Sequence, residues 1–392
     1  MDKFQRTLTL NKSILLGLSS MIGAGLFFNI SPTSKIASYS SILGLLLAGT
    51  VAFANASSSA QLARLFPETG GTYLYAKNVL GKYPSLIAGY SFAIGKLISC
   101  TAVALTLGNY LYPENPKVVS IIFIIFVTLI NYFGISKTVN IARWFVYTIV
   151  LILIFYIISV TSSSNFSFDI PIGKGFSFKN LILSASIWFF AFTGYSRLAT
   201  FGEEVDSPEK IIPKAILVGL GITLFLYVST SFVTLGIVNP SIIENSLTPL
   251  KVAFDLSRFS EFSYLIIIAS TVATGSVLLA LLPGISRVLV AMARDKKIPS
   301  LFMTIHPKQN SAYVADIFVG FIVVVGILNF DVLSAVKLSA IFILIYYSIT
   351  NLCVIRLEKS RRIFPIYMSA YGLLLCLIPV SYTHLTLPTT FG

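Results

Sequence analysis

Long apolar stretches separated by short polar segments recur along the whole chain. A helix needs about 20 apolar residues to cross a bilayer, and most of these stretches reach that length. The second is the least apolar, because Asn55 and Ser57–Ser59 interrupt it. The pattern predicts eleven membrane-spanning helices, over residues 12–37, 40–63, 84–111, 117–136, 142–161, 179–202, 211–238, 262–292, 313–330, 331–355 and 363–380.

Two of these spans are interrupted in the middle, span 1 at Met21–Phe27 and span 6 at Phe190–Tyr195. Glycine weakens a helix by about 1 kcal/mol, and lipid offers no water to backbone groups that a break exposes. Those groups must therefore face protein, a ligand or a water-filled cavity. Two breaks at corresponding places in two halves predict the central binding site of an alternating-access transporter. Glycines that serve only close helix packing are the alternative.

The composition excludes a soluble globular protein. The chain of 392 residues is 56% hydrophobic and 11% charged, whereas soluble domains carry about 25% charged residues. A net charge of +13 would suggest a nucleic-acid partner in a soluble protein, but here the charges are scattered over short loops. With a cytoplasmic N-terminus, 20 of the 28 Lys and Arg lie on the cytoplasmic side. We therefore expect a multi-pass protein of the cell membrane with its N-terminus inside and the lipid bilayer, not nucleic acid, as its partner.

Catalytic and cofactor motifs are missing from the sequence. The three cysteines, Cys100, Cys353 and Cys376, lie in apolar spans and are expected to be small buried hydrophobic residues. Neither of the two histidines has a partner at metal-ligand spacing, and no HExxH, GxSxG or Walker-type motif occurs. We expect no enzyme, no metal site and no cofactor.

The last segment, residues 381–392, ends a span abruptly with residues that suit neither a membrane nor a helix cap. It looks like translated sequencing-adapter read-through, with a short natural tail as the alternative. We expect a single transmembrane domain over residues 1–380 and a native chain that continues, with a twelfth span.

Four segments together resemble the amino acid–polyamine–organocation (APC) superfamily of permeases. They are Ser20–Phe27 in span 1, Gln61–Tyr73 after span 2, Phe189–Ala215 from span 6 into span 7, and Ser286–Asp295 at the end of span 8. Each is weak alone, but all four occur in order and at the expected spans. The resemblance covers residues 8–380.

The resemblance implies an all-α membrane protein with a five-plus-five inverted repeat, in which helices 1 and 6 are unwound at mid-membrane. Repeat one would cover residues 12–161 and repeat two residues 179–355, with 363–380 as an extra span. It implies secondary active transport of an amino acid or related amine, by proton symport or by exchange. Sodium symport, an amino acid-gated channel and a non-transporting amino acid sensor are the alternatives.

The two breaks supply the expected substrate site. Unwinding at Ile22, Gly23, Ala24 and Gly25 would leave N–H groups at the start of a half-helix, which favours a carboxylate. The break in span 6 would expose carbonyls to an α-ammonium group, at Phe190, Ala191, Phe192 and Thr193. Phe190 also lies where the family often places an aromatic gate, with simple packing as the alternative.

Lys96 is the one ionisable residue deep in a span, about 18 Å from either end. A charge at that depth costs at least about 2.5–3.5 kcal/mol. Family members often carry a lysine in span 5 that replaces a sodium ion, and Arg143–Thr161 has none. We expect Lys96 to supply the positive charge instead, as a proton carrier or substrate contact that disfavours arginine and lysine as substrates. A structural lysine bonded to carbonyls is the alternative.

Sodium coupling would need oxygen ligands between helix 1 and span 8. Hydroxyls of span 8 are the candidates, but such groups more often bond to carbonyls of their own helix, so a proton is favoured over sodium. The candidates are Ser270, Thr271, Thr274 and Ser276. Near the cytoplasmic side, the acidic group Glu203, Glu204, Asp206 and Glu209 is expected either to pair with Arg294, Lys296 and Lys297 across an inner gate or to remain solvated.

Overall fold

The computed structural model describes residues 6 and 8–384, except 69, 133–135, 174–175, 201–204, 307–308 and 310. Side chains at 136–142, 199–200 and 379–384 are likewise not described. Beyond His384, the predicted artefact lies outside the described residues. Within the described part the fold is helical, and one isolated parallel bridge joins Leu8 to Val205.

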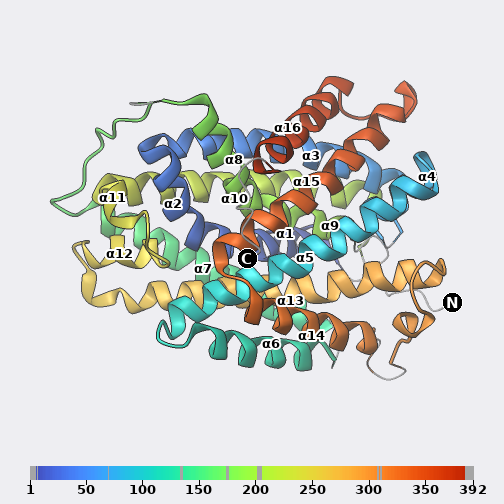
Figure 1. The fold of residues 1–392 in the computed structure, drawn as a ribbon, viewed down its shortest axis with the longest axis horizontal. Coiled ribbons are helices and arrows are strands. Elements are labelled where there is room, and N and C mark those ends of the chain that lie inside the picture. The colour runs from blue at the N-terminus through green and yellow to red at the C-terminus, as the bar shows by residue number, and fades with distance from the viewer. Residues whose placement is uncertain are drawn as a thin grey trace.

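Each predicted span coincides with one helix or with a pair of consecutive helices (Figure 1). The α-helices are α1 (Leu10–Met21), α2 (Ala24–Ala37), α3 (Ser41–Leu65), α4 (Thr72–Val79), α5 (Lys82–Leu111), α6 (Pro116–Tyr132), α7 (Ser136–Thr161), α8 (Phe178–Phe192), α9 (Ser196–Thr200), α10 (Pro208–Ile237), α11 (Pro240–Ile243), α12 (Pro249–Asp255), α13 (Tyr264–Arg294), α14 (Tyr313–Asn329), α15 (Val332–Arg356) and α16 (Ile366–His384). Seven helical segments of the described chain are long and apolar enough to cross a membrane, and one of them, Leu10–Leu65, contains the first two predicted spans. Three shorter apolar helices match predicted spans 4, 9 and 11.

The polar residues that weaken span 2 in sequence are buried between helices. Asn55, on α3, accepts a hydrogen bond at 2.6 Å from the side-chain amide of Asn351 on α15. Its own amide nitrogen lies 3.3 Å from the sulfur of Cys376 on α16. A polar side chain in a membrane helix is tolerated when a neighbouring helix supplies its partner, so these contacts hold α3, α15 and α16 together.

The helices of the adjacent predicted spans 9 and 10, α14 and α15, are separated by only two residues, Phe330 and Asp331. The Asp331 carboxylate accepts the backbone N–H of Ser334 at 3.0 Å and caps the N-terminus of α15. A carboxylate at this position satisfies an otherwise unpaired donor of the first turn. The chain therefore reverses at Phe330–Asp331 and begins a new span.

The long helices run side by side between two ends of the bundle (Figure 1). At one end lies α4, and at the other lie α11 and α12. We call these the α4 end and the α11 end. Helices α2 and α8 pack together near the middle, and α5 packs against both α13 and α15. This packing places the interruptions of spans 1 and 6 in the interior.

Candidate functional site

Span 1 is broken by two residues in extended conformation. Helix α1 ends at Met21, Ile22 adopts φ −74° and ψ 98°, and α2 begins after Gly23. No side chain caps the N-terminus of α2, so N–H groups of its first turn lack both intrahelical and capping partners. The expected break is therefore present but shorter than expected: Ile22 and Gly23 lie outside the helices, whereas Ala24 and Gly25 form the first turn of the 14-residue α2.

Glycines allow the two broken spans to cross at their breaks. A Cβ atom on Gly25 would overlap Ala191 of α8, and one on Gly194 would overlap the carbonyl of Ser20. A Cβ on Gly23 would lie 2.5 Å from Val277 of α13. Close packing, one of the two explanations that the sequence leaves open for these glycines, therefore operates here. It does not compete with binding, because the same contact brings both breaks to one place.

Span 6 is interrupted by a tight turn and is not unwound to an extended strand. A 3₁₀ turn, Thr193–Tyr195, joins α8 to α9. The Phe190 carbonyl accepts the hydroxyl of Thr193 at 2.9 Å. The Ala191 carbonyl accepts the hydroxyl of Tyr227, a residue of α10, at 3.1 Å. The carbonyls expected to be exposed at Phe190 and Ala191 thus have protein donors in this conformation.

The Thr193 carbonyl is the most heavily used acceptor at this break. It accepts the Lys96 ammonium at 2.8 Å, the Ser196 hydroxyl at 3.0 Å and the Tyr347 hydroxyl at 3.3 Å. These donors come from α5, α9 and α15, far apart in sequence. Sequence reasoning missed Tyr227 and Tyr347, because a tyrosine in an apolar span carries no local signal of its partner.

Lys96 is almost fully buried, with 1% of its surface exposed. Its hydrogen-bond acceptor is a carbonyl, and among the described residues it makes no ion pair. A buried ammonium without a carboxylate is costly in a membrane. The structure therefore places the Lys96 ammonium directly against the break of span 6, with a second buried cation, Arg197, two residues after the 3₁₀ turn. The contact of Lys96 agrees both with a functional lysine and with a structural one bonded to a carbonyl.

A small cavity lies where the breaks meet Lys96. Its volume of about 20 Å³ holds about one water molecule, whereas ligand pockets measure about 300–1,000 Å³. This conformation is thus closed around the centre. Six of the eight predicted substrate residues line the cavity: Gly23, Ala24, Gly25, Phe190, Ala191 and Thr193. The other two, Ile22 and Phe192, do not.

The candidate sodium ligands of α13 do not line this cavity. Thr271 donates to the Ile267 carbonyl at 2.8 Å, and Thr274 donates to the Ser270 carbonyl at 2.6 Å. Both hydroxyls therefore bond to their own helix, as the alternative explanation expects. The buried hydroxyls of Ser270 and Ser276 have no hydrogen-bond partner in the described structure. The cavity is instead lined on this side by Val277 and Leu281.

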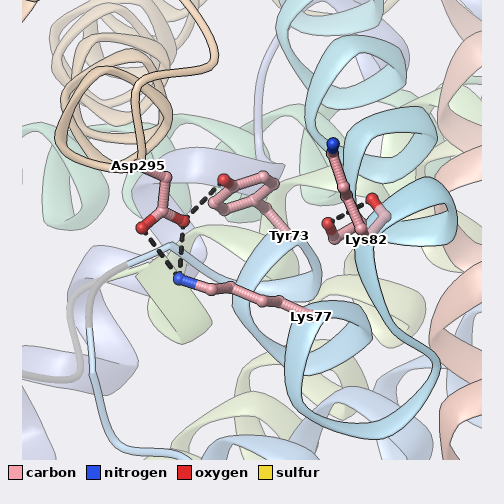
Figure 2. Close-up of polar contacts among 5 residues, drawn as sticks. Tyr73, Lys77, Lys82 and Asp295 are labelled. Atoms are coloured by element: carbon pink, nitrogen blue, oxygen red, sulfur yellow. Dashed lines mark hydrogen bonds and ion pairs between the residues drawn. The ribbon is translucent and has the colours of Figure 1, made fainter.

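A cluster of polar contacts joins α4 to the end of α13 (Figure 2). The Asp295 carboxylate, just after α13, accepts the Tyr73 hydroxyl at 2.7 Å and the Lys77 ammonium at 2.8 Å on both oxygens. Partial burial would raise the pKa of Asp295, but the hydrogen bonds from Lys77 and Tyr73 outweigh it and hold that pKa below its usual 3.8. We call these three residues the α4 latch.

The α4 latch differs from the inner gate expected from sequence. Glu203 and Glu204 lie outside the described residues, and no ion pair of Asp206 or Glu209 occurs within them. The residue that forms the pair is Asp295, within the basic cluster itself. Its partner lies on α4, 218 positions earlier in the chain, so spacing along the chain could not have revealed it.

A bundle of membrane-length helices with two broken spans crossing at a central cavity is the architecture of transporters built from inverted repeats. In structure the chain is similar to MhsT solved in complex with L-phenylalanine, with a TM-score of 0.69, 16% identity, and coverage of 98% of this chain and 99% of that one. The likeness confirms the expected all-α fold class with five-plus-five repeats.

The chain belongs to the amino acid permease family, whose sequence model matches residues 12–391. It is 34% identical over 382 residues to an uncharacterized transporter of Mycobacterium tuberculosis, covering 96% of this chain and 86% of the relative. It is 25% identical over 333 residues to the branched-chain amino acid permease BcaP of Bacillus subtilis, covering 78% and 71%. The expected membership of the APC superfamily is confirmed.

Proposed function

We propose that this protein moves an amino acid with a neutral or acidic side chain across the cell membrane by alternating access, coupled to a proton. The observation that carries the proposal is the placement of Lys96, which donates to the Thr193 carbonyl beside the uncapped N-terminus of α2. Membership of the amino acid permease family supports the solute class. A fixed cation beside the cavity opposes arginine and lysine as substrates.

The substrate carboxylate binds the N–H groups of Gly23, Ala24 and Gly25. These donors lie at the positive end of the α2 dipole, which favours an anion. The α-ammonium group binds carbonyls at the break of span 6, where it replaces a protein donor such as Tyr227 or Lys96. Binding is thereby linked to a rearrangement of the contacts that hold the centre closed.

Proton coupling follows from the same contact. Protonated Lys96 makes a charge-assisted hydrogen bond to Thr193 and ties α5 to the break of span 6. Loss of its proton removes the charge and weakens this tie. The centre then opens more easily when Lys96 is deprotonated than when it is protonated.

Uptake into proteoliposomes tests the proposal. We expect a neutral or acidic amino acid to enter in response to an inward proton gradient, and Lys96→Ala to lower the rate at least about tenfold and abolish its pH dependence. Lys96→Arg keeps a charge that does not titrate, so it separates the loss of charge from the loss of a proton. Unchanged uptake and pH dependence in Lys96→Ala would rule out the coupling role.

Three further measurements distinguish proton-coupled transport from sodium-coupled transport, a channel and a sensor. Flux that follows a sodium gradient and ignores the proton gradient would replace proton coupling by sodium coupling, with Ser270, Thr271 and Thr274 as the ligands to mutate. Ion current far above turnover rates in a planar bilayer would indicate a channel. Ligand-dependent thermal stabilisation without any flux would indicate a sensor.

We also propose that the α4 end faces the cytoplasm and the α11 end faces the outside. The excess of Lys and Arg in segments at the α4 end supports this orientation. Reporter fusions in the loops after α4 and after α12 would test it, and an external α4 loop would overturn it.

A further inference from the structure

A second pocket, larger than the central cavity, opens at the α11 end. Its volume is about 370 Å³. Its rim is polar: Lys35 on α2 and Asn245 after α11 are exposed, and Lys337 on α15 and Glu244 after α11 are half-buried. Its floor is formed by Phe28 and Ile187, each 4% exposed. We call this pocket the vestibule.

The vestibule lies next to the central cavity, on the side of the α11 end. Successive turns of α2 line first the cavity, at Ala24 and Gly25, and then the vestibule, at Phe28 and Lys35. On α8 the cavity residue Phe190 lies one turn from the vestibule residue Ile187. One helical turn rises about 5.4 Å, so a thin apolar floor separates the two spaces. A solute arriving from the α11 end meets the vestibule before the substrate site.

The vestibule has more positive than negative side chains, and its two lysines differ in whether another side chain already binds them. Two lysines and one glutamate line it, which leaves one net positive charge. Lys35 is engaged with the Asn245 side chain at 2.8 Å and so holds the covering loop against α2. Neither Lys337 nor Glu244 makes an ion pair among the described residues. The Lys337 ammonium is therefore available to a solute, with the Glu244 carboxylate in the same pocket for an opposite charge.

We propose that the vestibule is an outer binding site for the carboxylate of the substrate, with Lys337 as its anchor and Lys35 as a positioning residue. An amino acid docks with its carboxylate at Lys337 and its α-ammonium group toward Glu244, before it passes the floor. A solute with a second positive charge is disfavoured here as well as at Lys96. The choice of substrate by charge thus begins outside the central site. The inference rests on the proposed function for the identity of the solute.

Whether the charge of Lys337 makes the vestibule favour anions can be measured without a transport assay. The native cysteines are buried, so Ser246→Cys places one accessible thiol in the vestibule and Ser260→Cys places one on the exposed surface at the same end. Each full-length variant in liposomes is treated with a sulfonate-bearing and a trimethylammonium-bearing methanethiosulfonate. One unit charge at about 8 Å in water changes the two reagent rates about 2.4-fold in opposite directions, and so changes their ratio about fivefold.

We expect the ratio of anionic to cationic reagent rates at Ser246→Cys to exceed that at Ser260→Cys about fivefold. Adding Lys337→Gln removes the excess, and adding Lys337→Arg preserves it. The matched control Lys251→Gln removes a lysine that is paired with Asp255 at this end and leaves the ratio unchanged. Equal ratios at the two thiols, or an excess that survives Lys337→Gln, would overturn the inference.

Transport kinetics provide a second test of the role of Lys337. For the amino acid identified by uptake, Lys337→Gln is expected to raise KM about fivefold from the α11 side and to leave kcat within about twofold. An unchanged KM would overturn the role in substrate capture. If no amino acid is transported while the reagent preference depends on Lys337, the proposed function fails and the anion selectivity of the vestibule stands. If the preference is missing while uptake persists, the proposed function stands and the vestibule site fails.

Discussion

The two breaks at the centre of the protein expose opposite kinds of backbone group. At the break of span 1, two extended residues leave N–H donors at the start of α2 without a side-chain cap. At the break of span 6, a compact turn directs carbonyls toward hydroxyl and ammonium donors from α5, α10 and α15. Donors are thus left for a solute at one break, while the acceptors at the other are already taken by the protein.

This difference indicates which part of substrate binding requires rearrangement. An anionic group can bond to the N–H groups at the start of α2 without replacing a side-chain cap, whereas a cationic group must replace a donor at Ala191 or Thr193. Each exchange costs little when one hydrogen bond replaces another, because the net worth of a hydrogen bond is about 0.5–1.5 kcal/mol. The break of span 6 is therefore suited to act as the switch, and the break of span 1 as the anchor.

The largest expected effect comes from forcing the two breaks apart. Gly25→Ala places a methyl group against Ala191, and overpacking of this kind costs about 1–3 kcal/mol. We expect uptake to be abolished and the thermal unfolding midpoint in detergent to fall. Gly221→Ala, on α10, is the matched control, because a Cβ there meets nothing within 4 Å. Normal uptake in Gly25→Ala would show that the close crossing is unnecessary.

A smaller effect is expected from removing one donor shared by both breaks. The Tyr227 hydroxyl shares its one proton between the Met21 carbonyl at 2.6 Å and the Ala191 carbonyl at 3.1 Å. Tyr227→Phe leaves buried carbonyls unpaired, at a cost of about 1–3 kcal/mol. We expect lower thermal stability and faster opening of the centre, seen as increased labelling of a cysteine placed at Val103, which lines the cavity.

Tyr264→Phe removes the same hydroxyl from a half-exposed tyrosine at the start of α13 and controls for the chemistry of the change. Equal stability of Tyr227→Phe and Tyr264→Phe would mean that Tyr227 does not hold the breaks together.

The smallest effect is expected at the α4 latch, which lies away from both breaks. Lys77 and Asp295 are 47% and 26% exposed, so their ion pair contributes only about 0.5–1 kcal/mol. We expect Asp295→Asn to raise cysteine labelling from the α4 side about twofold to fivefold. Asp255→Asn breaks the comparable pair with Lys251 at the other end and should leave that labelling unchanged. A larger effect than that of Tyr227→Phe would make the latch, not the breaks, the main closure.

The pH dependence of the latch has a definite sign. Because the pKa of Asp295 is lowered in the folded protein, its contribution is complete above the usual value of 3.8 and is lost as the pH falls through the lowered pKa. The latch therefore remains formed between pH 5.5 and 7.5. A pH dependence of uptake in that range that disappears in Asp295→Asn would contradict this assignment and weaken the case for Lys96.

The sequence by itself determined the parts of this protein that depend on local periodicity. Apolar length and the glycines near Gly23 predicted the spans and the place of the first break, because a helix in lipid must satisfy its backbone within the segment. The depth of Lys96 in its span marked a buried charge at the centre. The form of the second break was different, since a 3₁₀ turn at Thr193 replaced the expected unwinding.

Only the tertiary structure decided which groups meet. The donors that fill the carbonyls of span 6 come from Tyr227 and Tyr347, and the latch joins residues that are 218 positions apart. The vestibule likewise combines lysines from α2 and α15 with a loop after α11. Such contacts depend on how helices pack, and one apolar helix face differs little from another in sequence. Local pattern therefore predicted where the membrane helices break, and packing decided what each break can bind.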